Sequence, residues 1–264
     1  MTSEELKKLQ ITACKVRMGI IESTHAAACG HPGGSLSSAD VLTYLYFKEM
    51  RVNPQEPNWA DRDRFVLSKG HAAPALYAVL AERGYFPVSD LTTLRKVGSY
   101  LQGHPCRSVT PGIDMSTGSL GQGVSAAAGM ALALKCQKKD SRVYTILGDG
   151  EIQEGEVWEA LMFASHYHLD NLCVMIDNNN LQIDGWVNEV MSPYPIDEKL
   201  KAFGLEVEVI DGHDLNQIEA ALGRARQTKG KPYGIVLKTV KGKGVSYMEN
   251  VGSWHGKAPD DRQF

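Results

Sequence analysis

Residues 143–185 read VYTILGDGEIQEGEVWEALMFASHYHLDNLCVMIDNNNLQIDG. This segment contains two continuous apolar runs, at 143–147 and 172–176, and a helical pattern over 154–168 separates them. Strands that are apolar at every position are buried on both faces, and a helix between two of them is typical of a parallel crossover. The segment therefore predicts two neighbouring parallel strands, each followed by polar residues.

The same alternation extends over the rest of the chain. Helices are predicted over residues 4–28 and 38–48, from His71 onward, and over 121–137, 196–203 and 214–228, and strands over 63–68, 206–210 and 233–239. Residues 30–35 are expected to break the first helix, residues 98–120 to be irregular, and the Gly-rich tail 241–264 to be partly ordered, and only against a partner. We expect one α/β domain over residues 1–264, with a doubly wound, mostly parallel sheet that has helices on both faces and binds ligands at the carboxyl ends of its strands.

The bulk composition narrows the possible classes of function. The net charge of -3 argues against a dedicated nucleic-acid binder, which is usually basic. The longest small-apolar stretch, residues 124–134, is about half of a membrane span, and the charged N-terminus lacks the apolar region of a signal peptide. The 5 cysteines contain no CxxC pair, so neither a disulfide framework nor a thiolate zinc site is indicated. We expect a cytoplasmic protein that binds neither nucleic acid nor membrane.

Polar side chains follow both strands of the opening segment. Asp149 lies between glycines after the first strand, and Asn179 follows the second. Adjacent parallel strands would bring the two side chains together at one edge of the sheet. Their oxygens, with a backbone carbonyl near Leu181, are ligands that Mg²⁺ prefers, and they leave positions for diphosphate oxygens and water. Each motif alone is readily a turn or an Asx-rich loop, but the pair predicts a site for a metal and a diphosphate.

A Gly-rich loop precedes the helix of very small residues. Residues 117–123 read TGSLGQG. Glycines at a helix start allow backbone N–H groups to face an anion, although a plain connection between loop and helix explains the pattern equally well. The spacing differs from that of a GxGxxG loop and no convincing strand comes before it, which disfavours a nicotinamide dehydrogenase.

Histidines in irregular or Gly-flanked positions form the third candidate group: His31, His71, His104 and His255. A lone histidine is more often structural than catalytic, but several such histidines in the loops of one domain indicate a shared site. Histidine is suited to proton transfer near neutral pH and can stabilise an alkoxide that develops on a carbonyl. We interpret the remaining histidines, His25, His166, His168 and His213, as structural.

The chain resembles the thiamine diphosphate enzymes and, within them, the N-terminal, diphosphate-binding domain of transketolase. The resemblance covers nearly the whole chain, and its motifs occur in order: GHPGGSLSSAD, DRFVLSKGHAAPALY, GHP, PGIDMSTGSLGQG, GDGEIQEGEVWEA, DNNNLQIDG and SWHGKAP. It implies the thiamine diphosphate-binding fold of that domain, with thiamine diphosphate as cofactor and Mg²⁺ or Ca²⁺ as metal.

The resemblance also implies roles for individual residues. The metal ligands are Asp149, Asn179 and the Leu181 carbonyl, and Gly150 contacts the diphosphate. Further residues implied at the cofactor are His71, Gly118, Ser119, Leu120 and Glu154, with Ser119 standing where the family often has proline. His31, His71, His104 and His255 are implied around the thiazolium and the sugar hydroxyls. Glu154 and Glu159 are implied at a subunit interface that links two cofactor sites.

A partner follows from the same resemblance. Activation of the cofactor in this family needs a glutamate from a pyrimidine-binding domain, and residues 1–264 contain no counterpart of that domain. We hypothesise that the chain is the N-terminal subunit of a split transketolase that acts on sugar phosphates. Its partner would carry the pyrimidine-binding and C-terminal domains, in an α2β2 heterotetramer.

Other functions remain open at this point. The chain could be half of a 1-deoxyxylulose-5-phosphate synthase-like enzyme, or of a transketolase for an unusual ketose, although EGEVWEA and SWHGKAP favour transketolase. A non-catalytic cofactor-binding paralogue should have lost metal ligands or loop histidines, and none is lost.

Overall fold

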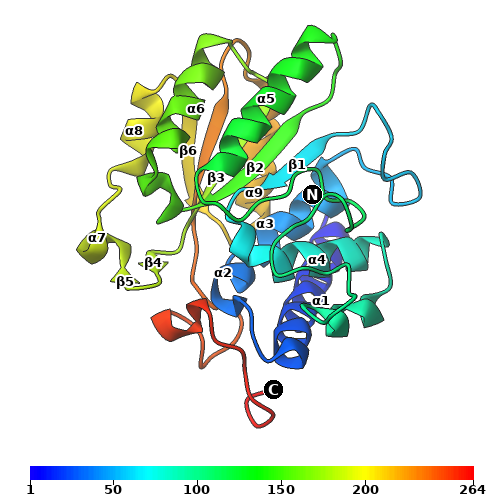
Figure 1. The fold of residues 1–264 in the computed structure, drawn as a ribbon. Coiled ribbons are helices and arrows are strands. Elements are labelled where there is room, and N and C mark those ends of the chain that lie inside the picture. Colours follow the sequence, from blue (N-terminus) through cyan, green and yellow to red (C-terminus); the bar gives the residue numbers. More distant parts are fainter.

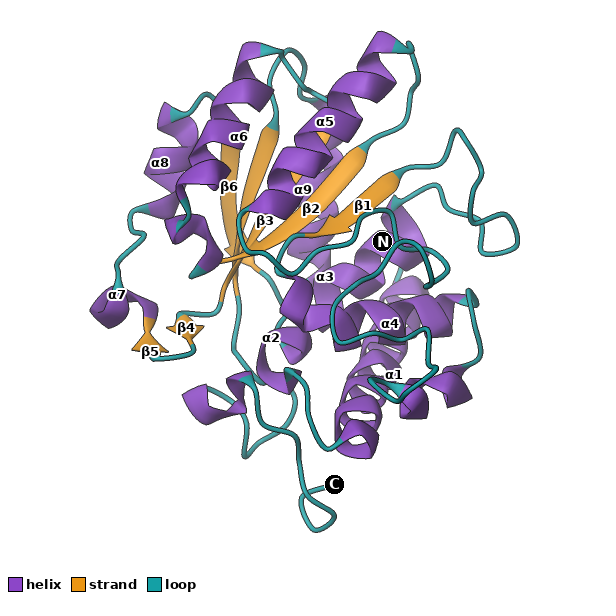
Figure 2. Ribbon diagram, in the orientation of Figure 1, coloured by secondary structure: helices purple, strands orange, loops and turns teal.

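The computed structural model describes residues 1–264, and a five-stranded parallel sheet lies at its centre (Figures 1 and 2). The strand order is β1-β2-β3-β7-β6. The bounds are β1 Arg64–Leu67, β2 Val143–Gly148, β3 Leu172–Asn178, β6 Glu206–Asp211 and β7 Tyr233–Lys238. Every neighbouring pair in this sheet is parallel. The predicted α/β fold with a mostly parallel sheet is therefore confirmed.

Helices cover both faces of the sheet, as the apolar strands predict. One face packs against α5 (Gln122–Cys136), α6 (Gly155–His166) and α8 (Ile196–Ala202), and these helices share a buried cluster with Val174 and Val236. The other face packs against α3 (Ala39–Tyr44) and α9 (Leu215–Gln227), in a cluster that contains Cys173, Met175 and Ile235. Successive strand residues thus enter opposite clusters, which is the period of two that defines a strand.

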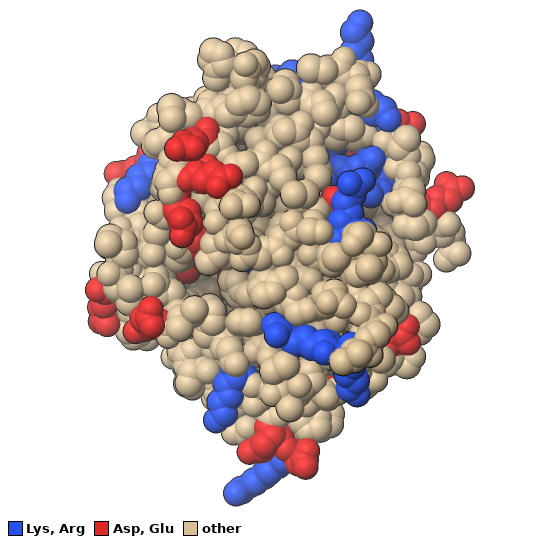
Figure 3. All heavy atoms as spheres, viewed as in Figure 1, with Lys and Arg blue, Asp and Glu red and all other residues tan.

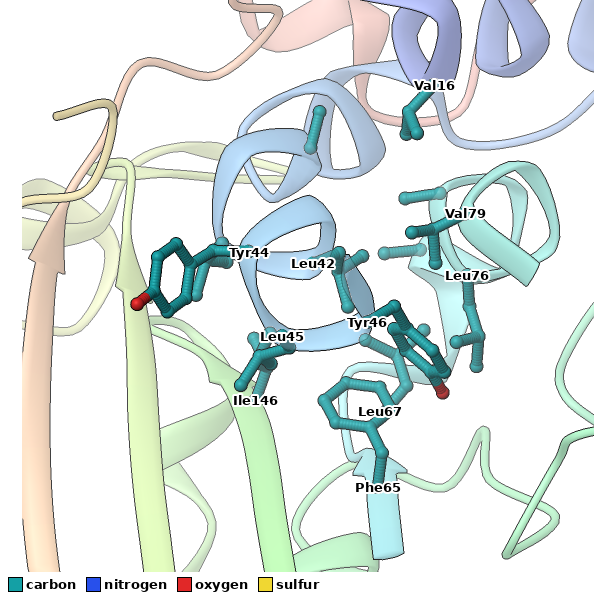
Figure 4. Packing of buried hydrophobic residues seen from close by; sticks show 14 of the residues in the cluster. Val16, Leu42, Tyr44, Leu45, Tyr46, Phe65, Leu67, Leu76, Val79 and Ile146 are labelled. Atoms are coloured by element: carbon teal, nitrogen blue, oxygen red, sulfur yellow. The ribbon is translucent and has the colours of Figure 1, made fainter. Parts of the chain in front are cut away.

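A second layer of helices lies outside α3. It consists of α1 (Ser3–Ala27) and α4 (Ala73–Arg83). Figure 4 shows how Val16, Leu42 and Val79, one from each of these three helices, turn toward a common core. All are buried, and burial of such a side chain contributes roughly 1.5–3 kcal/mol. The start of α1 is held by a capping box between Thr2 and Glu5.

Short elements account for the differences from the predicted secondary structure. Part of the expected break at residues 30–35 forms the helix α2 (Pro32–Leu36), because proline is well suited to a first helical turn. The helix expected over 38–48 is α3 followed by a π turn, η1 (Leu45–Glu49). A small hairpin of β4 (Leu181–Gln182) and β5 (Gly185–Trp186) and a turn of helix, α7 (Val187–Val190), were not predicted, since elements this short have no readable periodicity. The 3₁₀ turns are η2 (Gly70–Ala72), η3 (Val88–Thr93), η4 (Glu151–Gln153) and η5 (Gly252–His255).

The tail packs on its own domain, which corrects the expectation that it is ordered only against a partner. Met248 and Trp254 are buried. Phe264 stacks on His25 of α1, with ring centroids 4.1 Å apart. These few apolar residues are scattered among polar ones, so the composition of the tail did not predict that it packs on the domain. None of the helices has the length and apolar character needed to cross a bilayer.

Candidate active site

The carboxyl ends of β1, β2, β3 and β7 open onto one cavity of about 320 Å³. Its walls include ten of the residues singled out from the sequence: His31, His71, Gly118, Leu120, Asp149, Gly150, Glu154, Asn179, Leu181 and His255. His104 and Ser119 line a neighbouring hollow that shares Gly118 with the cavity. The tertiary structure therefore brings the predicted residues to one region, as expected for ligand sites in parallel α/β sheets.

One corner of the cavity is built from Asp149, Asn179 and the Leu181 carbonyl, and we call it the metal corner. Asp149 is 2% exposed and accepts hydrogen bonds from the N–H groups of Gly150 (2.8 Å) and Asn180 (2.6 Å) and from Asn178 Nδ2 (3.1 Å). None of these donors is charged. Burial, and next the charge of Asp177, raise the pKa of Asp149 to about 6. No cation is paired directly with this carboxylate, although the charge of Lys241 interacts with it, and a divalent cation would supply a direct countercharge.

The other donors of the metal corner are also hard oxygens. Asn179 Nδ2 donates to Asp177 at 3.0 Å, and Asn179 Oδ1 accepts the N–H of Leu181 at 3.2 Å. The Leu181 carbonyl accepts Lys241 Nζ at 2.8 Å. No group of three or more His, Cys, Asp or Glu side chains in the structure could hold a metal. A carboxylate, an amide oxygen and a carbonyl fit Mg²⁺ or Ca²⁺ completed by ligand phosphate oxygens.

The predicted histidines form a histidine cluster: His31, His71, His104 and His255. The ring of His31 lies 5.4 Å from those of His71 and His255 and 6.3 Å from that of His104, measured between centroids. His71 and His255 stack at 5.1 Å. His31 Nδ1 is buried without a hydrogen-bond partner, so a bound ligand could satisfy it.

The histidine cluster is uncharged at neutral pH. Burial, and then the nearby positive charges, lower the pKa of His31 to about 4 and that of His255 to about 3. The pKa values of His71 and His104 are lowered for the same reasons. His255 Nδ1 accepts a hydrogen bond from Lys241 Nζ at 2.8 Å, which places its ring proton on Nε2. These rings are therefore neutral donors and acceptors beside the metal corner, rather than groups that are half-protonated at pH 7.

The Gly-rich loop before α5 is held against the ends of β1 and β2. A Cβ on Gly123 would lie 2.6 Å from Ser68 Cα, so only glycine allows α5 to start this close to β1. Gly121 has a φ of +85°. Glu151, which is buried, accepts the N–H groups of Gly121 and Gly148, both at 3.0 Å, and Ser68 Oγ at 2.5 Å. Glu151 therefore clamps this loop to the strand that carries Asp149.

A family model described as "Transketolase, thiamine diphosphate binding domain" matches residues 8–263. The chain belongs to the transketolase family. The fold is thus that of a transketolase-type thiamine diphosphate-binding domain.

Relatives of two lengths share this transketolase-type domain. The chain is 48% identical over 247 residues to a 6-deoxy-6-sulfo-D-fructose transketolase subunit of Clostridium sp. (strain MSTE9), covering 94% of this chain and 90% of that protein. It is 42% identical to an apulose-4-phosphate transketolase subunit of Phocaeicola vulgatus, covering 98% of this chain and 92% of that protein. It is 44% identical to transketolase of Homo sapiens, covering 96% of this chain but 40% of that protein. Transketolase from Leishmania mexicana superposes with a TM-score of 0.91 at 35% identity, over 95% of this chain and 39% of that chain.

Several polar residues of this transketolase-type site were missed by the sequence analysis: Lys69, Glu151, Asp177 and Lys241. Lys69 and Lys241 follow the ends of β1 and β7, are 1% exposed, and line the cavity with Glu151. Burial lowers the pKa of Lys241 to about 8. The rule that located Asp149 and Asn179, a polar residue just after a parallel strand, would have found both lysines if it had been applied to every strand.

A larger hollow, of about 1000 Å³, lies near Arg62, Arg64 and Arg107. Arg62 there donates to both carboxylate oxygens of Asp114, at 3.0 and 2.6 Å, and Arg64 lies 3.7 Å from the same carboxylate. The guanidinium groups of Arg62 and Arg64 are thus already paired with Asp114, whereas Arg107 is exposed.

We predict that Glu151→Gln weakens binding of thiamine diphosphate about tenfold, because the amide has one acceptor oxygen and cannot accept both glycine N–H groups. Calorimetric titration of the cofactor with Mg²⁺ measures this effect. Glu198→Gln, the same change on an exposed residue of α8, is the matched control and should bind like the wild type. Equal affinities for all three proteins would show that the clamp is dispensable.

Proposed function

We propose that the chain is the N-terminal subunit of a split transketolase. With a partner subunit it would transfer a two-carbon ketol unit from a ketose phosphate to an aldose phosphate, using thiamine diphosphate and a divalent metal. The observation that carries this proposal is that three members of the histidine cluster, His31, His71 and His255, line one cavity with the metal corner. When bound, the cofactor supplies the carbon–carbon bond chemistry, and the protein supplies position and electrostatics.

The proposed roles follow the placement of the residues. Asp149, Asn179 and the Leu181 carbonyl would hold Mg²⁺, or Ca²⁺ in its place. Cofactor contacts are assigned to His71, Gly118, Ser119, Leu120, Gly150 and Glu154. His31, His71, His104 and His255 would donate to or accept from sugar hydroxyls and the developing alkoxide, and Glu154 would take part through the interface. Lys241 adds a buried positive charge that suits a diphosphate.

The need for a partner is supported by the open side of the cavity. Leu120 and Ile183 line it and are nevertheless 41% and 70% exposed. Apolar walls of a reaction site are normally shielded from water, because water weakens the electrostatic interactions inside.

In the view of Figure 3, acidic side chains gather over α6 and basic ones near β1, with a mostly uncharged band over α5 between them. Two relatives that are matched over 90% and 92% of their length are named as subunits. We therefore propose a partner with the pyrimidine-binding and C-terminal domains, in an α2β2 heterotetramer.

Two classes of sugar are candidate donors. The names of the two subunit relatives specify 6-deoxy-6-sulfo-D-fructose and apulose 4-phosphate. An unusual ketose is therefore a second candidate donor, beside the common ketose phosphates.

Isotope transfer in the reconstituted complex tests the proposed reaction. Donor ketoses labelled with ¹³C at C1 and C2 are incubated with an aldose phosphate, and the label should appear at C1 and C2 of a product two carbons longer than the acceptor. Release of CO₂ from pyruvate, with condensation onto glyceraldehyde 3-phosphate, would instead indicate the 1-deoxyxylulose-5-phosphate synthase type. A complex that binds the cofactor and moves no label from any donor would indicate a non-catalytic paralogue.

A further inference from the structure

Asp177 of β3 forms a fully buried ion pair with Lys69, which follows β1. The two residues are 0% and 1% exposed. Lys69 Nζ donates to Asp177 Oδ2 and also, at 2.7 Å, to the carbonyl of Gly34. A buried ion pair contributes little net stability compared with apolar side chains of similar volume, because both charges lose their hydration. Its presence here is better explained by what it holds in place.

The carboxylate of Asp177 receives hydrogen bonds from several elements. Ser37 Oγ donates to Oδ2 at 2.7 Å, Asn179 Nδ2 donates to Oδ2 at 3.0 Å, and Thr239 Oγ1 donates to Oδ1. An ionised carboxylate can only accept hydrogen bonds, and the ammonium group of Lys69 in direct contact stabilises that form. Every polar group that contacts the Asp177 carboxylate must therefore donate a hydrogen bond to it.

The acceptor-only carboxylate of Asp177 sets the orientation of the Asn179 side-chain amide. An asparagine amide has two orientations of nearly the same shape, which exchange Oδ1 and Nδ2. In the observed orientation Nδ2 faces Asp177, and Oδ1 accepts the N–H of Leu181 at 3.2 Å. The reversed orientation would place Oδ1 against the acceptor oxygen of Asp177 and Nδ2 against the N–H of Leu181. Both contacts would then be mismatched.

We propose that the Asp177–Lys69 pair is a positioning device that keeps the amide oxygen of Asn179 turned toward the metal corner. The pair does not itself contact the metal. The inference rests on the proposed function, since it treats Asn179 as a metal ligand. Outer partners that orient a ligand typically change metal affinity 10- to 100-fold, which sets the size of the expected effect.

The proposal is tested by replacing both residues of the Asp177–Lys69 pair, so that no unpaired charge remains buried. Asp177→Asn alone strands the ammonium group of Lys69 and could prevent folding. The double variant Asp177→Asn/Lys69→Met keeps the size of both side chains and removes both charges. The amide introduced at position 177 can itself turn, so only the N–H of Leu181 still favours the observed orientation of Asn179. Calorimetry should show Mg²⁺ binding to the full chain, at saturating thiamine diphosphate, about 10- to 100-fold weaker than for the wild type.

A rescue experiment separates positioning from general damage. Asn179→Asp provides an oxygen in both orientations. In the wild-type background this change places a carboxylate against Asp177 and should weaken Mg²⁺ binding. In the double-variant background the repulsion is absent, and the same change should strengthen Mg²⁺ binding. A loss of structure would not be reversed in this way, so the change of sign in the cycle distinguishes removal of the Asp177–Lys69 pair from general damage.

A matched control is Asp211→Asn, at the end of the edge strand β6, where the residue is exposed and outside the cavity. It should bind Mg²⁺ like the wild type. A folded double variant with wild-type Mg²⁺ affinity, or an Asn179→Asp effect of the same sign in both backgrounds, would overturn the positioning role. Failure of the wild-type chain to bind Mg²⁺ and thiamine diphosphate at all would overturn the proposed function, and this inference with it.

Discussion

The purified chain is expected to show negligible ketol transfer by itself, at least about 100-fold below the rate that it reaches after a partner subunit is added. The cavity holds a metal corner and neutral histidines, but its apolar walls at Leu120 and Ile183 are open to water. The buried carboxylate of Asp149 belongs to the metal corner, and that of Glu151 clamps backbone N–H groups. Under the split-enzyme proposal, the group that activates the second ring of the cofactor comes from the partner subunit.

Steady-state transfer assays over a range of partner concentrations measure this effect. The rate should rise until the two subunits are equimolar and then level off, and the partner alone should be inactive. Size-exclusion chromatography with light scattering gives the mass of the active species. Full activity of the isolated chain would refute the split-enzyme proposal, whereas activity at a mass other than that of two copies of each subunit would refute only the α2β2 assembly.

The second large effect is expected for Asp149→Ala, which should lower the Mg²⁺-dependent affinity for thiamine diphosphate by on the order of 100-fold or more. Asp149 is the only carboxylate of the metal corner, where the remaining donors are the neutral oxygens of Asn179 and Leu181. Loss of this charge leaves the cation without ionic compensation in a buried site. Titration of the cofactor at fixed Mg²⁺ and, separately, of Mg²⁺ at fixed cofactor measures the loss. Equal binding by the variant and the wild type would refute the metal assignment.

Thermal unfolding separates this effect from loss of structure. The folded-state pKa of Asp149 is raised to about 6, so its stabilising contribution is present at low pH and is lost as the pH rises through that value. At pH 7 the charged carboxylate therefore costs stability in the metal-free chain. The isosteric variant Asp149→Asn removes this cost but also replaces one acceptor oxygen with an NH₂ group, so it should melt close to the metal-free wild type. Mg²⁺ and thiamine diphosphate should raise the melting temperature of the wild type only.

Much of the fold could be predicted because the strands are short continuous apolar runs. Val143 and Leu172 start two of them, and they are paired in the structure. Because the carboxyl ends of these two parallel strands lie side by side, Asp149 is close to the 178–180 segment. The histidine cluster could be predicted because several histidines in irregular or Gly-flanked positions indicate a shared site. Small elements such as β4 and α7 could not be predicted, since so few residues show no helical or strand periodicity.

The sequence by itself determined the order of strands and helices along the chain, the residues that follow each strand, and the family to which they belong. These features are local, because a strand buried on both faces appears as a run of consecutive apolar residues, and its end appears as the polar residues that follow directly. Only the tertiary structure decided which polar residues meet. Lys69 pairs with Asp177 across 108 positions, and Glu151 holds Gly121 across 30. Such contacts depend on the arrangement of strands in the sheet and on the depth of burial, which no local pattern encodes, and they turn the Asp149 and Asn179 motifs into a site with a defined orientation.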